Sequence, residues 1–362
     1  MTDAPHPSDA LTGIVVAVQA NYYRVKLSAS GTPGDVMELL CTRRSRLKKL
    51  GQQIMVGDQV GIEEPDWQGG RGAIATLSPR TTQLQRPPVA NANQVLLMFS
   101  LADPALDPLQ LTRFLVTVAV TQLSVVLCLN KQELVSTAEQ QQWQARLQAW
   151  GYEPTFVSLY AGTGLSELHE RLQGKLTVVS GPSGVGKSSL INHLIPDREV
   201  RVGAVSDRWG QGKHTTRHVE LFDLPGGGLL TDTPGFNQPS TVCAPQALAQ
   251  YFPEAKQRLE QEQCQFNDCF HRDEPNCAVR GDWERYPYYL TLLEEVIADQ
   301  GEKDAIANAE STVKRKAKGK GKTEYEPKLS SKRYRRPSRR SQRQNLKDLY
   351  PDRHDTKDSS NY

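Results

Sequence analysis

Apolar and polar positions follow a strand-like pattern over the first part of the chain. Residues 11–80 contain short apolar runs separated by Gly-containing turns, as in GIVVAVQANYYRVKL and QQIMVGDQVGIE. Short strands with such turns are typical of small β-barrels. We therefore predict a five-stranded barrel of the oligonucleotide-binding (OB) type over 11–80. A disordered segment at 1–10 precedes it, and a Pro-containing linker at 81–90 follows it.

After the linker the pattern changes to apolar strands that alternate with helices. NQVLLMFSL, LSVVLCLNK and YEPTFVSLY have the composition of buried strands, and helical periodicity separates them at 108–120 and 137–150. The alternation continues through LTVVSGPSG, a helix that begins near Lys187, and GGLLTDTPG. This order predicts a parallel α/β sheet, which we assign to 91–240. Residues 241–300 have a helix-rich pattern and form a separate predicted domain.

Positive charge is concentrated near the C-terminus. The net charge is only +3, yet the segment from Lys314 to Arg343 contains fourteen Lys or Arg residues and two acids, Glu324 and Glu326. A basic segment rich in Ser and Gly predicts a tail at 301–362 that is disordered when free. Such a tail is expected to bind a polyanion, most plausibly nucleic acid.

A second basic cluster lies within the predicted barrel. CTRRSRLKKL places five cations between Arg43 and Leu50. Such a run is either a solvated loop or, on a barrel of this type, a contact to nucleic acid. The sequence alone favours neither reading.

The sequence also indicates where the protein works. The first ten residues, MTDAPHPSDA, are polar and carry two acids, which fits neither a secretory signal nor a transit peptide. The longest apolar segment, Phe114 to Leu129, is interrupted by Thr, Gln and Ser and is too short to cross a bilayer. Scattered cysteines fit a reducing compartment. We therefore expect a cytoplasmic protein without a membrane segment.

The stretch GPSGVGKS at 181–188 matches the phosphate-loop pattern G-x-x-x-x-G-K-[ST]. It follows an apolar strand and precedes an apolar helix, which is the context that this loop requires. Lys187 is expected to bridge the β- and γ-phosphates and to stabilise the charge that moves during catalysis, while Ser188 ligates Mg²⁺. The predicted phosphate-binding residues are Gly181, Pro182, Ser183, Gly184, Val185, Gly186, Lys187, Ser188 and Ser189.

The segment LNKQEL predicts which base the site binds. GTPases place N-K-x-D after a strand, where the carboxylate accepts hydrogen bonds from the N1–H and amino groups of guanine; adenine lacks both donors on that edge. Asn130 and Lys131 fit this pattern, and Glu133 supplies the carboxylate on a side chain one methylene longer. Ser158, in FVSLYAGTG, occupies the place of a second base-contacting loop, although Leu159 and Tyr160 depart from its usual S-A-K sequence.

LLTDTPGFN resembles the magnesium and switch segment of a guanine-nucleotide hydrolase. Asp232 is expected to hold Mg²⁺ through water, and the Gly235 N–H to contact the γ-phosphate. A switch hydroxyl from Thr215 or Thr216, in GQGKHTTRH, completes the magnesium site. Phe236 stands where well-known GTPases place a glutamine, and a phenylalanine cannot orient the attacking water by hydrogen bonding.

These elements occur in an unusual order. The base-contacting segments precede the phosphate loop, whereas a usual GTPase begins with the phosphate loop and ends with them. The order found here is a circular permutation, which a compact domain tolerates because its termini often lie close together.

The helix-rich domain contains a candidate metal centre. Cys264, Cys269, His271 and Cys277 provide three thiolates and one imidazole within fourteen residues. Four such ligands suffice for one closed tetrahedral zinc site. Because no coordination position stays open, we expect a structural ion rather than a catalytic one.

Taken together, the sequence resembles the circularly permuted, ribosome small-subunit-dependent GTPases (RsgA/YjeQ family). The resemblance covers about residues 10–300 and includes GPSGVGKSSLIN, GKHTTRHVELF, LLTDTPGF and CQFNDCFHRDEPNC. It implies a barrel, a permuted GTPase and a zinc domain, and GTP hydrolysis that the small subunit stimulates late in its maturation. It also favours Thr216 as the switch threonine and His214 as the residue that reaches the attacking water.

The expected ligand is GTP or GDP, and the expected partner is the small ribosomal subunit with its ribosomal RNA. The protein itself is expected to be a monomer. The zinc cluster follows the D-T-P-G switch by about 30 residues, so we expect Phe236 and the segment after it to transmit the nucleotide state to the zinc domain. The main alternative is a non-enzymatic RNA-binding module that uses GTP only as a conformational ligand. An ATP-dependent kinase or transporter ATPase is a third reading, which the N-K-Q-E and D-T-P-G segments disfavour.

Overall fold

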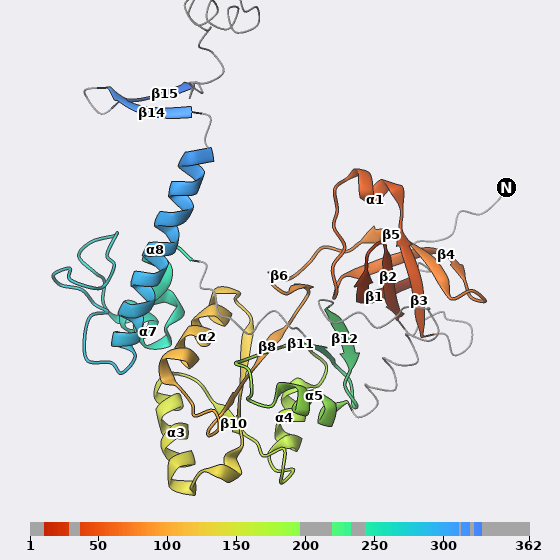
Figure 1. Cartoon of the computed structure of the whole chain (residues 1–362), viewed down its shortest axis with the longest axis horizontal. Coiled ribbons are helices and arrows are strands. Elements are labelled where there is room, and N and C mark those ends of the chain that lie inside the picture. The colour runs from red at the N-terminus through yellow and green to blue at the C-terminus, as the bar shows by residue number, and fades with distance from the viewer. Residues whose placement is uncertain are drawn as a thin grey trace, which may run out of the picture. The chain divides into compact units, whose positions relative to one another are not determined.

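A computed structural model describes residues 11–28, 37–195, 219–232, 243–310, 313–318 and 322–327 (Figure 1). The chain forms two compact units, Met1–Ile297 and Ala298–Tyr362. The predicted site residues His214, Thr215, Thr216, Gly235 and Phe236 lie outside the described residues.

The N-terminal strands close into a barrel, as predicted. Its strands are β1 (Leu11–Gln19), β2 (Tyr22–Leu27), β3 (Glu38–Arg43), β4 (Gln59–Asp66) and β5 (Arg71–Leu77). They pair in the order β1-β2-β3-β5-β4, and the pairing of β4 with β1 closes the ring. Alternate residues such as Val15, Val25, Leu39, Cys41 and Ile74 fill the interior and are almost fully buried. The short helix α1 (Ser45–Lys49) follows β3 and carries the basic cluster.

The predicted linker is a small hairpin packed into a core. Strands β6 (Gln83–Gln85) and β7 (Pro88–Ala90) pair, and Leu84 and Val89 are buried in an apolar cluster that also contains residues of the barrel and of the central sheet. The two prolines obscured this short apolar alternation in the sequence. The segment therefore joins the barrel to the next domain through a packed contact rather than as a free tether.

The central sheet has the predicted parallel arrangement. Strands β8 (Gln94–Ser100), β9 (Ser124–Asn130), β10 (Pro154–Phe156), β11 (Leu176–Ser180) and β13 (Leu229–Asp232) run parallel, and β12 (Glu220–Asp223) is antiparallel to β13. Their order is β10-β9-β8-β11-β13-β12. β12 also pairs with β1 of the barrel, where Arg24 and Lys26 form ion pairs with Glu220 and Asp223.

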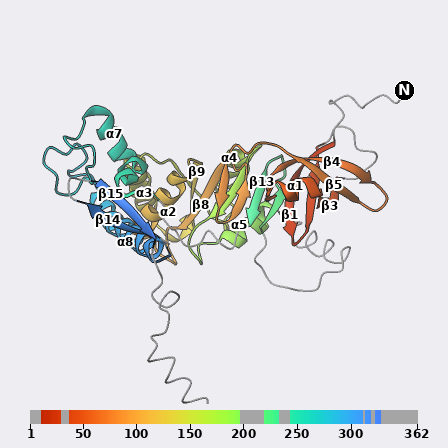
Figure 2. The same cartoon turned by 90° about the horizontal axis from the view of Figure 1, so that it is seen from above.

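Helices cover both faces of this sheet (Figure 2). Along β8, Leu97 and Phe99 pack toward α2 (Pro108–Val120) and α3 (Thr137–Ala149). The alternate residues Leu96 and Met98 pack toward α4 (Leu165–Leu172) and α5 (Lys187–Leu194). All seven residues of β8 are buried, as expected for a central parallel strand that is covered on both faces.

The zinc-ligand segment belongs to a small helical module. It contains η2 (Pro245–Tyr251), α7 (Pro253–Gln261) and the start of α8 (Tyr286–Glu310). Its aromatic core includes Phe252, Trp283 and Tyr289, whose rings meet edge-on or tilted. Val116 of α2 belongs to the same core, so the module packs directly on the central domain. Among the described helices, none is long and apolar enough to cross a membrane.

The second unit differs from the expectation of disorder beyond Gly301. Helix α8 continues to Glu310 through a segment rich in Ala, Glu and Lys, which favour helix. An antiparallel hairpin follows, formed by β14 (Val313–Lys318) and β15 (Lys322–Pro327). Residues 328–362 lie outside the described residues.

A buried arginine fixes the helical module on the central domain. Arg285 is fully buried; its Nε donates to Glu254 Oε1 at 2.8 Å and its Nη2 to Glu254 Oε2. Its guanidinium also stacks on the rings of Trp150, Tyr152 and Phe252 at 4.9–5.5 Å from their centroids. A planar cation suits this combination of carboxylate and aromatic partners better than an ammonium would.

Replacing Arg285 with Ala should lower the free energy of unfolding by about 3–5 kcal/mol, because the Glu254 carboxylate, which is only 14% exposed, then loses its ion-pair partner. Urea denaturation followed by tryptophan fluorescence measures the change. Arg171→Ala is the matched control: its partners Glu153 and Glu167 are exposed, so we expect a change within about 0.5 kcal/mol. Equal stability of the two variants would contradict the structural role of Arg285.

Candidate nucleotide site and metal centre

The parallel strands bring the predicted site residues to one edge of the sheet. The register pairs Ser100 at the end of β8 with Asn130 at the end of β9. β11 ends at Ser180, immediately before the phosphate loop, and β13 ends at Asp232. Ligands of open α/β sheets bind at the carboxyl ends of such strands, where the connecting loops converge.

Glycines shape the phosphate loop between β11 and α5. Gly181 has φ +140°, and an added Cβ would lie 2.1 Å from the carbonyl oxygen of Met98. Gly186 has φ +101°, and its added Cβ would lie 2.6 Å from Asn130 Nδ2. Both positions therefore require glycine. Their φ angles are positive, which L side chains rarely adopt, and a neighbouring atom occupies the space that a side chain would need. The result is a loop whose backbone N–H groups can converge on an anion.

Several residues of the phosphate loop and of the first turn of α5 are exposed to a ligand. Lys187 begins α5, and its ammonium donates to the Gly181 carbonyl oxygen at 2.8 Å, so it lies within the loop. The residues exposed on the loop and the first turn of α5 are Ser183, Gly184, Ser188 and Ser189, whereas Pro182 and Val185 are buried. The start of α5 adds the partial positive charge of its unpaired N–H groups, which favours a bound phosphate.

Asn130 connects the base-contacting segment to the phosphate loop. Its side chain is buried, and its Nδ2 donates to the Val185 carbonyl oxygen at 2.9 Å. Its Oδ1 is also buried and has no hydrogen-bond partner among the described residues. A buried acceptor without a partner is costly, so this atom is available to a donor that enters the site.

The two predicted base-contacting segments lie side by side. Gln132 N–H donates to the Val157 carbonyl oxygen at 3.2 Å, and its side-chain amide donates to Thr163 Oγ1 at 2.7 Å. Ser158 is buried, and its hydroxyl accepts the Ala161 N–H at 3.0 Å. The second segment is therefore folded back on itself beside the first.

Glu133 is exposed on a short 3-10 helix, Gln132–Leu134, and Tyr160 of the neighbouring loop is 92% exposed. Asn130, Lys131 and Ser158 lie at the carboxyl-end edge of the sheet, the same edge that holds the phosphate loop. Sequence reasoning missed Gln132 and Thr163, which join the two segments. Gln132 fills the variable position of the N-K-Q-E segment and Thr163 lies in the second base-contacting segment, but no motif pairs them, so only the fold reveals their contact.

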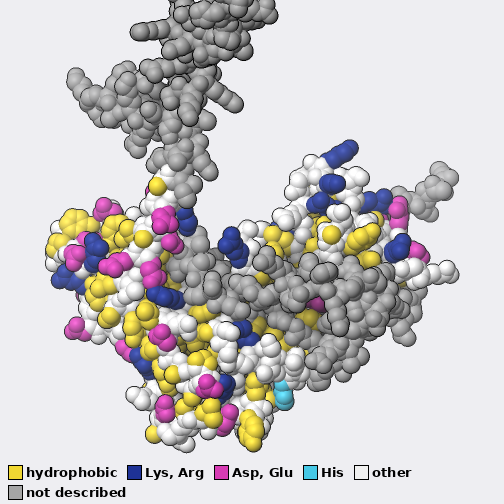
Figure 3. Space-filling model, viewed as in Figure 1, with side chains coloured by type: hydrophobic (Ala, Val, Ile, Leu, Met, Phe, Trp, Pro, Cys, Tyr) yellow, Lys and Arg dark blue, Asp and Glu magenta, His cyan; other side chains and the backbone are white. Residues whose placement is uncertain are grey.

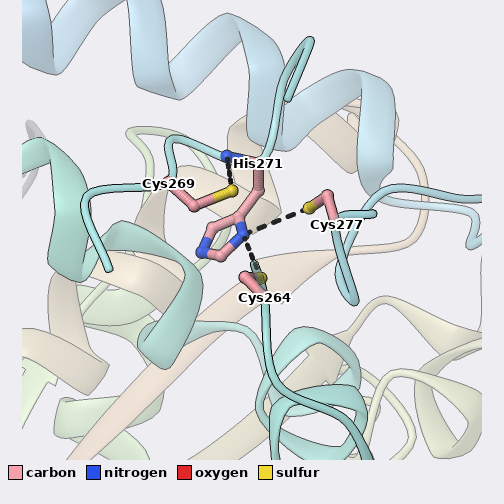
Figure 4. Close-up of side chains that lie close together, drawn as sticks. All are labelled: Cys264, Cys269, His271 and Cys277. Atoms are coloured by element: carbon pink, nitrogen blue, oxygen red, sulfur yellow. Dashed lines mark hydrogen bonds between the residues drawn. The ribbon is translucent and has the colours of Figure 1, made fainter. Parts of the chain in front are cut away.

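The four predicted zinc ligands form one cluster (Figure 4). Their ligand atoms all lie within 4.8 Å of one another, and His271 Nδ1 lies 3.4 Å from the sulfurs of both Cys264 and Cys277. Zn–S and Zn–N bonds of about 2.3 and 2.0 Å at a tetrahedral angle place sulfur and nitrogen about 3.5 Å apart. The spacing therefore fits a zinc ion bound to Cys264, Cys269, His271 and Cys277.

The loops around the cluster are held by backbone hydrogen bonds. The N–H groups of His271 and Arg280 donate to the sulfurs of Cys269 and Cys277, each at 3.4 Å. Glu274 accepts the N–H groups of Phe270 and Arg272 at 2.8 Å and that of Asp273 at 3.1 Å. Such outer contacts orient the ligands of a metal site.

Burial of the cluster disfavours charge on its side chains in the absence of a metal ion. Burial raises the pKa of the Cys269 thiol to about 12, and burial lowers the pKa of the His271 imidazole. The pocket alone thus disfavours thiolate charge, whereas zinc binding requires thiolates and supplies the compensating charge. The chain offers four ligands for a tetrahedral ion, the donor set typical of structural zinc sites.

The fold and site together define a circularly permuted P-loop GTPase, in which the base-contacting strand precedes the phosphate loop along the chain. Comparison with known proteins agrees with this class. The RsgA GTPase family model matches residues 77–242. The chain belongs to the RsgA GTPase family.

Its similarity to individual members extends over nearly the whole length. It is 58% identical to the small ribosomal subunit biogenesis GTPase RsgA of Trichormus variabilis, covering 94% of this chain and 97% of that protein. It is 51% identical to the protein of the same name from Microcystis aeruginosa, with the same coverage of 94% and 97%.

Two solved structures share the fold. The crystal structure of YjeQ from Thermotoga maritima matches with a TM-score of 0.66 and 30% identity, covering 79% of this chain and 98% of that one. The structure of YloQ, described as a circularly permuted GTPase, matches with a TM-score of 0.66 and 27% identity, covering 82% and 99%.

Replacing Cys269 with Ser should remove zinc from the purified chain and lower its melting temperature by several degrees, because the free energy of binding a structural metal contributes to folding. Elemental analysis gives the zinc content, and a thermal scan gives the stability. Cys243→Ser is the matched control, since Cys243 is half-buried in the same module but does not belong to the cluster. Full zinc content in the Cys269 variant would contradict the assigned ligand set.

Proposed function

We propose that this chain hydrolyses GTP to GDP and phosphate during late maturation of the small (30S) ribosomal subunit, and that the subunit stimulates the reaction. The observation that carries the proposal is the 58% identity, over 94% of the chain, to a small ribosomal subunit biogenesis GTPase. The hydrogen bond between Asn130 and the Val185 carbonyl supports it, because it joins a base-contacting loop to a phosphate loop. We further propose that the protein acts as a cytoplasmic monomer.

The phosphates bind where α5 begins. The backbone N–H groups of 181–188 and the Lys187 ammonium stabilise the charge that shifts toward the β–γ bridge oxygen as the γ-phosphoryl group leaves. Ser188, Thr216 and Asp232 are the residues that would hold a Mg²⁺ ion bound with the nucleotide, which would neutralise phosphate charge. The Gly235 N–H orients the γ-phosphate.

The base binds between the two loops that Gln132 and Thr163 join. Asn130 and the neighbouring Ser158 loop contact the purine edge, and Lys131 packs along the ring. The Glu133 carboxylate accepts from guanine N1–H and the amino group, which adenine does not offer. Its exposure leaves it accessible to the base, and the flexible extra methylene lets it reach the same hydrogen bonds as an aspartate.

The attacking water requires a residue other than Phe236. We propose His214, in the switch segment GKHTTRH, as the side chain that orients this water once ribosomal RNA orders the segment. An unbound chain then hydrolyses GTP slowly, because the water lacks a fixed partner.

Ribosomal RNA contacts the chain through its cationic surfaces. Arg46, Lys48 and Lys49 are exposed on α1 of the barrel, beside Leu50, which is 63% exposed (Figure 3). Arg44, at the start of α1, is instead paired with Glu63 and Glu64. The free cations of α1 and the basic tail contact phosphates, which gives salt-dependent binding with little sequence preference.

Adding purified small ribosomal subunits should raise the steady-state rate of GTP hydrolysis by at least about tenfold, because the partner completes the site. Phosphate release measured with and without subunits tests this. Lys187→Ala controls for contaminating hydrolases and should lose the stimulated rate. Slow hydrolysis that subunits leave unchanged would favour a GTP-regulated RNA-binding module instead.

Replacing His214 with Ala should lower the subunit-stimulated rate by about 100-fold while leaving GDP affinity unchanged, because the side chain contacts the water and not the nucleotide. His193→Ala is a matched control: His193 is exposed on α5, away from the loop that binds phosphate. Both variants are compared by single-turnover hydrolysis with saturating subunits. If the His214 variant kept the full subunit-stimulated rate, another residue would have to orient the attacking water.

A further inference from the structure

The loop that follows β8 lies beside the nucleotide site without matching any GTPase motif. It begins at Leu101 and ends at Leu106, which are buried in the core beneath α2 and α3. The Ser100 hydroxyl donates to the Pro104 carbonyl oxygen at 2.7 Å, and the Leu101 N–H donates to the Asn130 carbonyl oxygen at 3.0 Å. These contacts hold the start of the loop against β9 and tie Pro104 back to the end of β8. The side chains of Asp103 and Pro104 are exposed at the tip of the loop.

The tip of this loop contacts both parts of the site. The Lys131 ammonium donates to the Asp103 carbonyl oxygen and lies 3.7 Å from the Asp103 carboxylate. On the other side, a Cβ built on Gly184 of the phosphate loop would lie 3.6 Å from Pro104 Cδ, which is ordinary van der Waals contact. The tip therefore contacts the base-contacting segment and lies close to the phosphate loop.

The contact between the Lys131 ammonium and Asp103 restricts the lysine side chain before a base binds. A lysine side chain has four rotatable bonds, and a base that packs along its stem must otherwise immobilise them. With the ammonium held at Asp103, the end of the side chain is already fixed before the base arrives. Preorganisation of this kind strengthens binding because less freedom is lost in the complex.

The backbone of Asp103 is suited to this task. Its φ is +48°, in the left-handed region that Asp tolerates better than most residues and β-branched residues tolerate poorly. This conformation belongs to the same residue whose carbonyl oxygen accepts from Lys131. The carboxylate, which is 92% exposed, adds an ion pair but fills no core volume.

We propose that Asp103 is a positioning residue for guanine-nucleotide binding, which holds the Lys131 ammonium and so fixes the stem that packs on the base. The proposal rests on the assignment of Asn130 to Glu133 as the guanine loop. It predicts an effect on nucleotide affinity rather than on the chemical step.

Asp103→Val should weaken GDP binding by about tenfold and raise KM for GTP similarly, while kcat with saturating subunits changes little. Asp103→Asn should recover most of the affinity, because Asn also tolerates positive φ and keeps the carbonyl in place. Titration with a fluorescent GDP measures the affinities, and steady-state kinetics measures KM and kcat.

Gln122→Val is the matched control. Gln122 is exposed and has φ +61°, so the substitution imposes the same backbone strain. It precedes β9, at the edge of the sheet opposite the nucleotide site. We expect both Val variants to lose similar thermal stability and only the Asp103 variant to lose GDP affinity.

A double-mutant cycle separates positioning from general damage to the loop. Lys131→Met keeps the aliphatic stem but removes the ammonium, so adding Asp103→Val to it should weaken GDP binding little further. GDP affinity unchanged in Asp103→Val, or losses that add in the double variant, would overturn the proposal. A wild-type chain that bound GDP no more tightly than ADP would instead overturn the guanine-loop assignment itself.

Discussion

The hydrogen bond from Asn130 Nδ2 to the Val185 carbonyl oxygen joins two loops that are 55 residues apart in the chain. It is buried, so water does not compete for either atom, and it holds the base-contacting segment at a fixed separation from the phosphate loop. Gly186 must lack a side chain because the Asn130 amide occupies that volume. A nucleotide spans both loops, so its two ends can be recognised together only while this separation is kept.

The same constraint explains why the permuted order of elements is harmless. The site requires that β8, β9, β11 and β13 lie in parallel with their carboxyl ends together, and this is a property of the sheet rather than of the chain order. New termini only change where the chain enters and leaves. In this protein the entry is used to attach the barrel, which continues the sheet through the pairing of β1 with β12.

The zinc module is fixed to the helix that leads away from the base-contacting segment. α3 begins after the Ser136 N-cap and ends at Ala149. The ring of its C-cap residue, Trp150, stacks on Arg285, and its Nε1 donates to Glu284 at 2.8 Å. α2 contributes Val116 to the core of the module. These contacts connect the end of α3 and α2 of the central domain with the helical module. Whether the module responds to nucleotide then depends on the rigidity of α3 as well as on the switch.

Much of the site could be predicted from local sequence. The phosphate loop depends on glycines and a lysine at fixed spacing, and the zinc ligands lie within fourteen residues, so their chemistry is visible without the fold. The barrel and the parallel sheet followed from apolar periodicity. The hairpin β6–β7 was hidden by its prolines, and the end of α8 with the hairpin β14–β15 by the surrounding positive charge, because composition outweighed short alternations in both segments.

The sequence by itself therefore determined the class of protein, a P-loop GTPase, and placed a phosphate-loop motif and a Cys3His cluster in it. Only the tertiary structure decided which residues support them. Asp103 reaches Lys131, Gln132 reaches Thr163, and Arg285 meets Trp150, each through contacts between elements that are far apart in the chain. Motifs encode groups that must be close in sequence to act together, whereas these supporting contacts depend on strand register and helix packing, which no local pattern records.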